Sequence, residues 1–130
     1  MFLNFTNHPS SFWSSEQQAA ALHYGSIQDL AFPQVNPEAP LSEIQQLAKY
    51  YAQKIISKKP DCVLCQGEFT LCYQIIALLK QAGIPVVAAC AERNSQEIIS
   101  DGTSKKVTVF RFVQFREYQQ PEHLSMESLI

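Results

Sequence analysis

The sequence predicts a single α/β domain of three layers, built on a mostly parallel sheet with a β-hairpin at its carboxyl end. Two observations lead to this prediction. Between residues 2 and 90, short apolar stretches alternate with stretches of helical period, an order that places helices on both faces of a parallel sheet. Further along, apolar and β-branched residues lie on either side of Asp101-Gly102, a dipeptide typical of hairpin turns.

The expected elements follow in order along the chain. Strands are expected at residues 2–6, 26–32, 62–65 and 85–90, with two hairpin strands inside 96–115 joined by a loop longer than the tightest turn; helices are expected at residues 15–24, 41–59 and 69–81. The helix at 41–59 has an amphipathic period. Three prolines fall within residues 33–40, so that segment is expected to be an extended surface loop.

Boundary residues support these helix limits. Ser14 and Gln17 form a capping-box pattern before the first helix, and Gly25 stands where a C-terminal glycine is expected. Pro60 stops the second helix, and Gly83 closes the third.

Length and composition limit the domain organisation. With 130 residues, 46% of them hydrophobic and 17% charged, the chain has room for one core and no separate catalytic domain. We expect one α/β domain over residues 1–118 and a mobile tail over 119–130, where no period is visible. The first residues lack a basic segment and an unbroken apolar run, so they predict neither a signal peptide nor a membrane span. We expect a cytoplasmic protein.

Four cysteines, Cys62, Cys65, Cys72 and Cys90, lie in stretches expected to be core. Free thiols of this kind are typical of a reducing compartment and are usually buried structural groups. Cys62 and Cys65 have the spacing of a redox or zinc pair, but a strand directs residues three apart to opposite faces. The cysteines therefore predict neither a disulfide framework nor a metal site.

A candidate binding site follows from the order of the strands. In an open parallel sheet, ligands collect outside the carboxyl ends of the strands where the strand order reverses. The first and third strands are the natural pair, and they end at Asn7-His8 and at Gln66-Gly67-Glu68. The glycine permits a tight bend and leaves backbone N–H groups at a helix N-terminus, which favours anions. Glu68 has an alternative role, because a carboxylate at this position also stabilises the helix.

His8 is a candidate for proton transfer, since histidines titrate near neutral pH. The alternative is a hydrogen bond to a neighbouring loop. His23 and His123 are expected at the surface. No clustered aspartates accompany His8, and the chain contains no dinucleotide, phosphate-loop, zinc-protease or serine-hydrolase motif. We therefore expect no metal and no cofactor.

The charge distribution points to a local anion site. The formal net charge of −2 excludes a strongly basic protein of the kind that binds duplex nucleic acid or a membrane surface. Arg93, Arg111 and Arg116 nevertheless all fall in the last 38 residues. They are either solvated groups at strand ends or a site in which arginine grips a phosphate with two hydrogen bonds.

Several stretches occur in the order found in one family. The first strand ends in "LNFTNHPS" and is followed by "WSSEQQAA", a central turn reads "GEFTLCY", the fourth strand runs into "AACAERNSQE", and the last stretch reads "VFRFVQFREY". Across residues 2–118 this order resembles the small CRISPR-associated proteins of type III systems that are related to CARF (CRISPR-associated Rossmann-fold) sensors and are linked to ring-nuclease activity.

The resemblance implies a homodimeric Rossmann-like (CARF-like) domain that binds a cyclic oligoadenylate second messenger, cyclic tetra-adenylate above all, across its twofold axis. It implies metal-independent cleavage to linear products with a 2′,3′-cyclic phosphate, which switches off the antiviral signal. RNA carries its own nucleophile, so the protein has to hold the 2′-hydroxyl in line, neutralise charge and assist proton transfer. On this interpretation the candidate catalytic residues are His8, Glu68 and Arg93. The candidate ligand-binding residues are Asn7, Gln66, Gly67, Phe69, Thr70, Tyr73 and Arg116.

Two other function classes stay open. One is a module that senses or sequesters the same ligand without cutting it, and the other is an unrelated α/β interaction domain whose arginines only decorate its surface. Phe69, Tyr73 and Trp13 also have two interpretations, because each either stacks on adenine or packs in the core. On the first hypothesis Glu68 accepts a ribose hydroxyl or orients an arginine.

Overall fold

The computed structural model describes residues 1–130. Its strands are β1 (Phe2–Phe5), β2 (Ile27–Asp29), β3 (Cys62–Cys65), β4 (Val86–Ser100) and β5 (Thr103–Glu117). Its helices are α1 (Ser15–Leu22), α2 (Leu41–Ser57), α3 (Phe69–Gln81) and the short α4 (Met126–Leu129), with a 3-10 turn, η1 (Ser10–Phe12), after β1.

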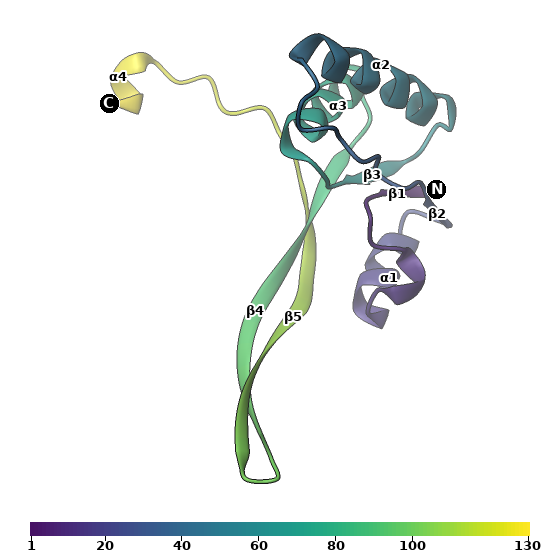
Figure 1. Cartoon of the computed structure of the whole chain (residues 1–130). Coiled ribbons are helices and arrows are strands. Elements are labelled where there is room, and N and C mark those ends of the chain that lie inside the picture. The colour runs from purple at the N-terminus through teal and green to yellow at the C-terminus, as the bar shows by residue number, and fades with distance from the viewer.

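The five strands form one sheet in the order β2-β1-β3-β4-β5. The first four strands are parallel to their neighbours, and β5 runs antiparallel to β4. Helix α1 packs on one face of the sheet, and α2 and α3 pack on the other (Figure 1). The expected α/β architecture with a mostly parallel sheet and a C-terminal hairpin is confirmed, and its layout is compatible with a Rossmann-like fold.

The core is divided between the two faces of the sheet, because successive strand residues point to opposite sides. Leu3 and Phe5 of β1 pack with residues of α2 and α3, whereas Phe2 packs with Ala21 of α1. In α3, Ile75 is completely buried in the larger cluster. Burial on both faces explains why β1 and β3 lack the alternation of a half-exposed strand.

The helix boundaries largely follow their marker residues. The Ser14 hydroxyl caps α1 by accepting a hydrogen bond from the Gln17 N–H at 3.2 Å. Helices α1 and α2 end slightly earlier than expected, at Leu22 and Ser57. Helix α3 occupies the expected residues, and Gly83 follows it with a φ of 78°, which glycine adopts without strain.

The largest departure from expectation concerns β4. The sequence predicts a strand over residues 85–90 that is separate from the hairpin, but β4 continues to Ser100 and pairs with β5 throughout. The hairpin turn is also tighter than expected, because Ser100 pairs with Thr103 and only Asp101 and Gly102 lie between them. Both turn residues have positive φ, 52° and 74°, as two-residue hairpin turns of one common type require.

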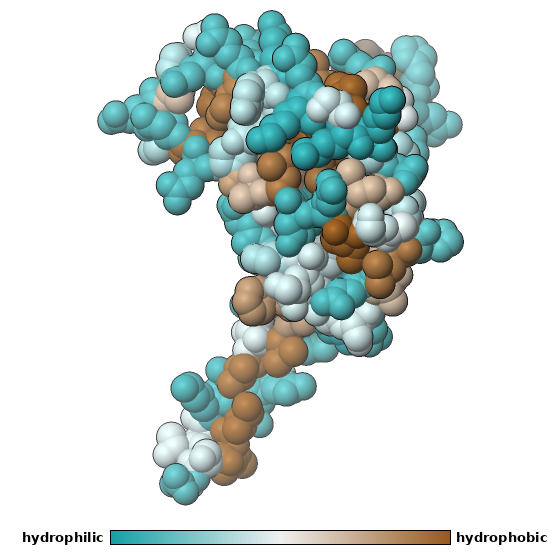
Figure 2. Space-filling model, turned by 90° about the vertical axis from the view of Figure 1, so that its right-hand side faces the viewer, coloured by the Kyte–Doolittle hydropathy of each residue, from teal (hydrophilic) through white to brown (hydrophobic).

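Most of this hairpin projects away from the rest of the molecule (Figure 1). Only Val86 and Val87 of β4 pair with β3. We call residues 91–112 the arm and the remainder of the domain the body. Figure 2 shows apolar side chains running along the arm. The large apolar residues exposed there are Ile98, Ile99, Val109 and Phe110.

A β-bulge marks the base of the arm. Cys90 pairs with Gln114, and the next residue, Ala91, pairs with Phe112. Val113 is therefore an extra residue in β5 that has no partner in β4. Bulges of this kind bend a strand and increase its local twist.

The tail beyond β5 contains only α4, and its side chains are exposed. None of the helices has both the length and the apolar character that crossing a lipid bilayer requires.

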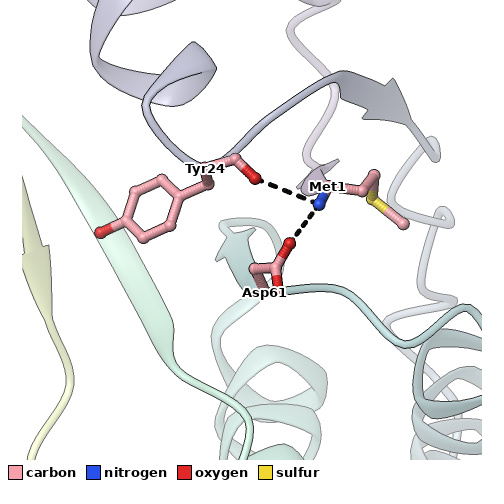
Figure 3. A network of polar contacts seen from close by, with 3 residues as sticks. All are labelled: Met1, Tyr24 and Asp61. Atoms are coloured by element: carbon pink, nitrogen blue, oxygen red, sulfur yellow. Dashed lines mark hydrogen bonds and ion pairs between the residues drawn. The ribbon is translucent and has the colours of Figure 1, made fainter.

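The amino end of β1 is tied to two other segments. The α-amino group of Met1 donates a hydrogen bond to the Tyr24 carbonyl oxygen at 3.2 Å and forms an ion pair with the Asp61 carboxylate (Figure 3). Tyr24 follows α1 and Asp61 precedes β3. This contact therefore lies at the amino ends of β1 and β3, on the side of the sheet opposite to their carboxyl ends.

Candidate functional site

The carboxyl ends of the parallel strands border a hollow of about 350 Å³. It lies where the strand order reverses between β1 and β3, the expected position for a ligand in an open parallel sheet. His8 follows β1 and Gly67 follows β3, and both line the hollow, so the prediction that their loops share one sheet edge is confirmed. The lining residues are Asn7, His8, Cys65, Gln66, Gly67, Phe69, Cys72, Ala88 and Tyr118.

The backbone of His8 is held by polar side chains. Its carbonyl oxygen accepts hydrogen bonds from Asn4 Nδ2 at 2.8 Å and from Trp13 Nε1 at 3.1 Å. The Thr6 hydroxyl accepts from the His8 N–H at 3.0 Å and donates to the Asn4 side chain at 2.8 Å. The imidazole itself is exposed and takes part in none of these bonds. The loop is thus fixed while the ring is free to meet a ligand.

Asp29 of β2 completes this network. Its carboxylate accepts hydrogen bonds from Asn4 Nδ2 at 3.0 Å and from the Ser10 N–H at 3.2 Å. Asn4 and Thr6 are buried, and these bonds satisfy polar groups whose burial would otherwise be costly. β1, β2 and η1 are thereby joined next to the His8 loop.

Gln66 and Gly67 form the opposite wall of the hollow. Gln66 Oε1 accepts a hydrogen bond from the Ala89 N–H at 2.8 Å, which leaves the amide nitrogen of this side chain as a free donor group. Gly67 does not have a positive φ. A Cβ atom at this position would lie 2.3 Å from Cδ1 of Phe32. Glycine is therefore required because a side chain does not fit here, and not because of the tight bend that we expected.

Glu68 caps α3 and does not line the hollow. Its carboxylate accepts hydrogen bonds from the N–H groups of Leu71 at 2.8 Å and Thr70 at 3.0 Å, and from the Thr70 hydroxyl. The Leu71 and Thr70 N–H groups lower the pKa of the Glu68 carboxyl. The protein's own carboxylate therefore occupies the anion position at this helix N-terminus. The geometry favours the capping alternative, and it gives no support to the ligand-contacting roles predicted for Glu68 and Thr70.

Two aromatic side chains, Phe69 and Tyr118, line the hollow. Phe69 is 89% exposed; Tyr73, one helical turn later, is also exposed but does not line the hollow. The core interpretation of Phe69 and Tyr73 is therefore wrong. Trp13 does pack internally, with its ring centroid 6.2 Å from that of Phe2. Partial burial raises the pKa of the Tyr118 hydroxyl.

The predicted arginines lie in different places. Arg93 is in the arm, six residues beyond Val87, the last β4 residue paired with β3. At about 3.3 Å per strand residue, it lies about 20 Å along the strand from that point. The expectation that Arg93 follows the fourth strand at the site is wrong, because β4 does not end at Cys90. Arg116 pairs with Ala88, which lines the hollow, and no acidic side chain forms an ion pair with Arg116.

Two thiols contribute to the wall of the hollow. The Sγ atoms of Cys65 and Cys72 are 3.5 Å apart, and both residues line the hollow. Cys62 lies on the other face of the sheet, where burial raises the pKa of its thiol to about 11. All four cysteines are free. No three His, Cys, Asp or Glu side chains are grouped as metal ligands would be.

Residues 1–116 match the model of one protein family. The chain belongs to the Uncharacterized protein MJ1673 family. The segment matched by the MJ1673 family model contains the arm and every residue that lines the hollow except Tyr118. No curated protein and no solved structure matches the chain.

Within this family segment, sequence reasoning missed six residues of the site: Asn4, Thr6, Asp29, Cys65, Cys72 and Ala88. Asn4 and Thr6 carry a usable signal, since Asn4 is the one polar residue in the stretch "FLNF" and a buried polar group requires a partner. Cys65 and Cys72 carry no such signal. Their contact depends on how α3 returns over the end of β3, which residue spacing alone does not reveal.

Proposed function

We propose that the protein binds cyclic oligoadenylate, with cyclic tetra-adenylate as the expected ring, and cleaves it without a metal ion in the cytoplasm. The observation that carries this proposal is the free imidazole of His8, which stands on a fixed loop at the same hollow as the Gln66 amide. The order of motifs across residues 2–118, which resembles that of CARF-related ring nucleases, supports it. Ring opening would switch off type III CRISPR antiviral signalling.

The reaction needs few protein groups because the substrate carries its own nucleophile. The ribose 2′-oxygen attacks the adjacent phosphorus, the bond from phosphorus to the 5′-oxygen breaks, and a 2′,3′-cyclic phosphate and a 5′-hydroxyl result. His8 accepts the proton of the 2′-hydroxyl, and the departing 5′-oxygen takes up a proton from water. The side-chain N–H groups of Gln66 and Asn7 bind the phosphate oxygens as negative charge develops there.

The size of the hollow favours two copies of the chain around one ligand. A volume of about 350 Å³ is at the small end of ligand sites and accepts about one nucleotide unit. A ring of several nucleotides then needs the hollows of two protomers facing each other, so we propose a homodimer. The exposed rings of Phe69 and Tyr73 provide surfaces on which adenine stacks.

Arg116 is the arginine placed to neutralise a phosphate. It lies directly across from Ala88 of the hollow, and paired residues of antiparallel strands share a face of the sheet. Arg93 and Glu68 are left out of the catalytic set, because Arg93 belongs to the arm and Glu68 to the cap of α3.

A second candidate function is binding without cleavage. One observation favours it: of the three predicted catalytic residues, only His8 lines the hollow. A protein of this kind would sense or sequester the messenger.

The deciding experiment incubates the protein with cyclic tetra-adenylate and a metal chelator and analyses the nucleotides by mass spectrometry. Linear product supports the ring nuclease. An intact ring that co-elutes with the protein supports the binding module, and absence of any interaction contradicts both.

Two arginine variants form a matched pair for the binding step. Arg116→Ala should weaken the affinity for cyclic tetra-adenylate by about ten- to a hundredfold, since a charge-assisted contact contributes about 1.5–3 kcal/mol. Arg93→Ala removes the same charge from the arm and should change the affinity less than about twofold. Equal effects in isothermal titration calorimetry would rule out Arg116 as the phosphate contact.

The role of His8 is tested under single-turnover conditions with saturating protein. His8→Ala should slow cleavage by about a hundredfold or more, because general acid–base assistance contributes about 10²–10⁴, and should leave affinity nearly unchanged. A rate within a fewfold of wild type would mean that positioning of the 2′-hydroxyl alone drives the reaction.

A further inference from the structure

The thiols of Cys65 and Cys72 are nucleophilic groups at the hollow that the proposed reaction does not use. We propose that these two cysteines form a reversible disulfide on exposure to a hydroperoxide, and that this bond changes the shape of the hollow. The effect on ligand rests on the proposed function, whereas the disulfide itself does not.

Geometry makes this pair the one that can be joined. The two Sγ atoms are 3.5 Å apart. A disulfide bond requires them to approach to about 2.05 Å, a shift that needs side-chain rotation together with a small displacement of the start of α3. Cys65 ends β3 and Cys72 lies in the second turn of α3. Cys62 packs in the cluster on the opposite face of the sheet, so it does not compete for either partner.

The two thiols differ in access and in acidity. Cys72 is 8% exposed at the hollow, whereas Cys65 is fully buried. A hydrogen bond from the Cys65 thiol lowers the pKa of Cys72, although burial acts in the opposite direction. Donating that bond, together with burial, raises the pKa of Cys65. Because the thiolate is the reactive form, Cys72 is the attacking group and Cys65 the resolving thiol.

The chemistry balances with hydrogen peroxide as the oxidant. The Cys72 thiolate attacks one peroxide oxygen, the O–O bond breaks, and hydroxide leaves and takes up the proton that the thiol lost. The Cys72 sulfenic acid is then attacked by Cys65 sulfur, which forms the S–S bond and releases the oxygen as water with the Cys65 proton. Two thiols and one peroxide thus give one disulfide and two water molecules.

The bond would alter the groups that face the ligand. Cys65 directly precedes Gln66, and Cys72 lies one turn after Phe69 on α3. Drawing the two sulfur atoms together pulls the start of α3 toward the end of β3. The Gln66 amide and the Phe69 ring then change position relative to His8, so oxidation should weaken ligand binding.

The first test maps the disulfide directly. The full chain is treated with hydrogen peroxide, free thiols are blocked with iodoacetamide, and peptides are analysed by mass spectrometry. A cross-linked Cys65–Cys72 peptide that disappears with dithiothreitol is expected. Cys90→Ser, which removes a thiol outside the hollow, should give the same cross-link.

A further variant separates the two roles. In Cys65→Ser, the Cys72 sulfenic acid has no resolving thiol and should be trapped by dimedone. If oxidised wild-type chain contains free Cys65 and Cys72, or irreversible Cys72 sulfinic acid without a cross-link, the proposal is overturned. The wild-type mapping decides the matter even where a variant does not fold.

The second test compares the affinity of reduced and oxidised Cys90→Ser protein for cyclic tetra-adenylate. Oxidation should weaken binding at least about fivefold, with recovery after dithiothreitol. Unchanged affinity in the cross-linked protein would overturn the regulatory part. Absence of binding by the reduced protein would instead refute the proposed function and leave the mapped disulfide standing.

Discussion

The body and the arm are stabilised by different interactions. The body buries apolar side chains on both faces of its sheet, whereas the arm is a two-stranded ribbon with exposed residues such as Ile99 and Phe110. A two-stranded hairpin is at best marginally stable in water. The position of the hollow is therefore set by burial, while the arm depends on cross-strand pairs and on its attachment to the body.

The same substitution in the two regions should give the largest contrast. Ile75→Ala in α3 should lower the free energy of unfolding by about 2–5 kcal/mol, because it leaves a cavity in the core. Ile99→Ala in the arm should change it by less than about 0.5 kcal/mol, since Ile99 is 76% exposed and Ile75 is 0% exposed. Urea unfolding at several protein concentrations measures both. A concentration-dependent loss for Ile99→Ala would show that the arm is covered by another copy in solution.

Two glycines sharpen the comparison because they are required for different reasons. Gly67→Ala should destabilise the body by about 1–3 kcal/mol, since the new methyl group meets Phe32. Gly102 has a φ of 74°, and a Cβ atom there would meet no neighbour within 4 Å. Gly102→Ala should therefore lower the free energy of unfolding by about 1 kcal/mol, because alanine is forced into a left-handed backbone conformation.

Asparagine distinguishes these two causes. It tolerates the left-handed conformation, so Gly102→Asn should recover most of the loss caused by alanine. Gly67→Asn should be worse than Gly67→Ala because it is larger. Thermal unfolding midpoints measure these differences. If the Ala and Asn variants have the same order of midpoints at Gly67 as at Gly102, this account is contradicted.

Two carboxylates give the smallest expected contrast. Glu68→Gln removes the charge that caps α3 and should cost about 0.5–1 kcal/mol at pH 7. Glu92→Gln breaks an exposed pair with Arg111 in the arm, where the atoms are 3.4 Å apart, and should cost at most about 0.5 kcal/mol.

The Glu68 effect should also depend on pH. Its pKa is lower in the folded chain than the ordinary value of 4.5, so the stabilisation is complete well above pH 4.5 and is lost as pH falls through the lower folded value. The difference in unfolding free energy between wild type and Glu68→Gln should therefore shrink below pH 4.5. A difference that stays constant down to pH 3 would exclude the charged cap.

The sequence predicts the body better than the arm for a physical reason. Burial imposes an apolar period on α2 and continuous apolar runs on β1 and β3, and these patterns can be read directly. The ribbon at the base of the arm packs against no core, so the polar stretch Glu92–Gln96 gives no sign that β4 continues. Arg93 was misplaced for that reason.

The candidate site was predicted in part. The switch-point rule located the His8 and Gly67 loops, because strand order determines which ends meet. It could not choose between the two roles of Glu68, since the same residue type suits a helix cap and a ligand contact. Nor could it find the contact of Cys65 with Cys72, which depends on tertiary packing.

The unpaired Val113 has an evolutionary consequence. Its removal would leave Cys90 opposite Gln114 and Ala91 opposite Phe112, now in an unbroken ladder with less bend. A single-codon deletion would thus change the direction in which the arm points, without altering any cross-strand pair of the arm or any residue at the hollow. Conversely, an insertion at the same place would bend the ribbon further. The direction of the arm can therefore change in evolution while the composition of the arm and the rest of the sheet stay the same.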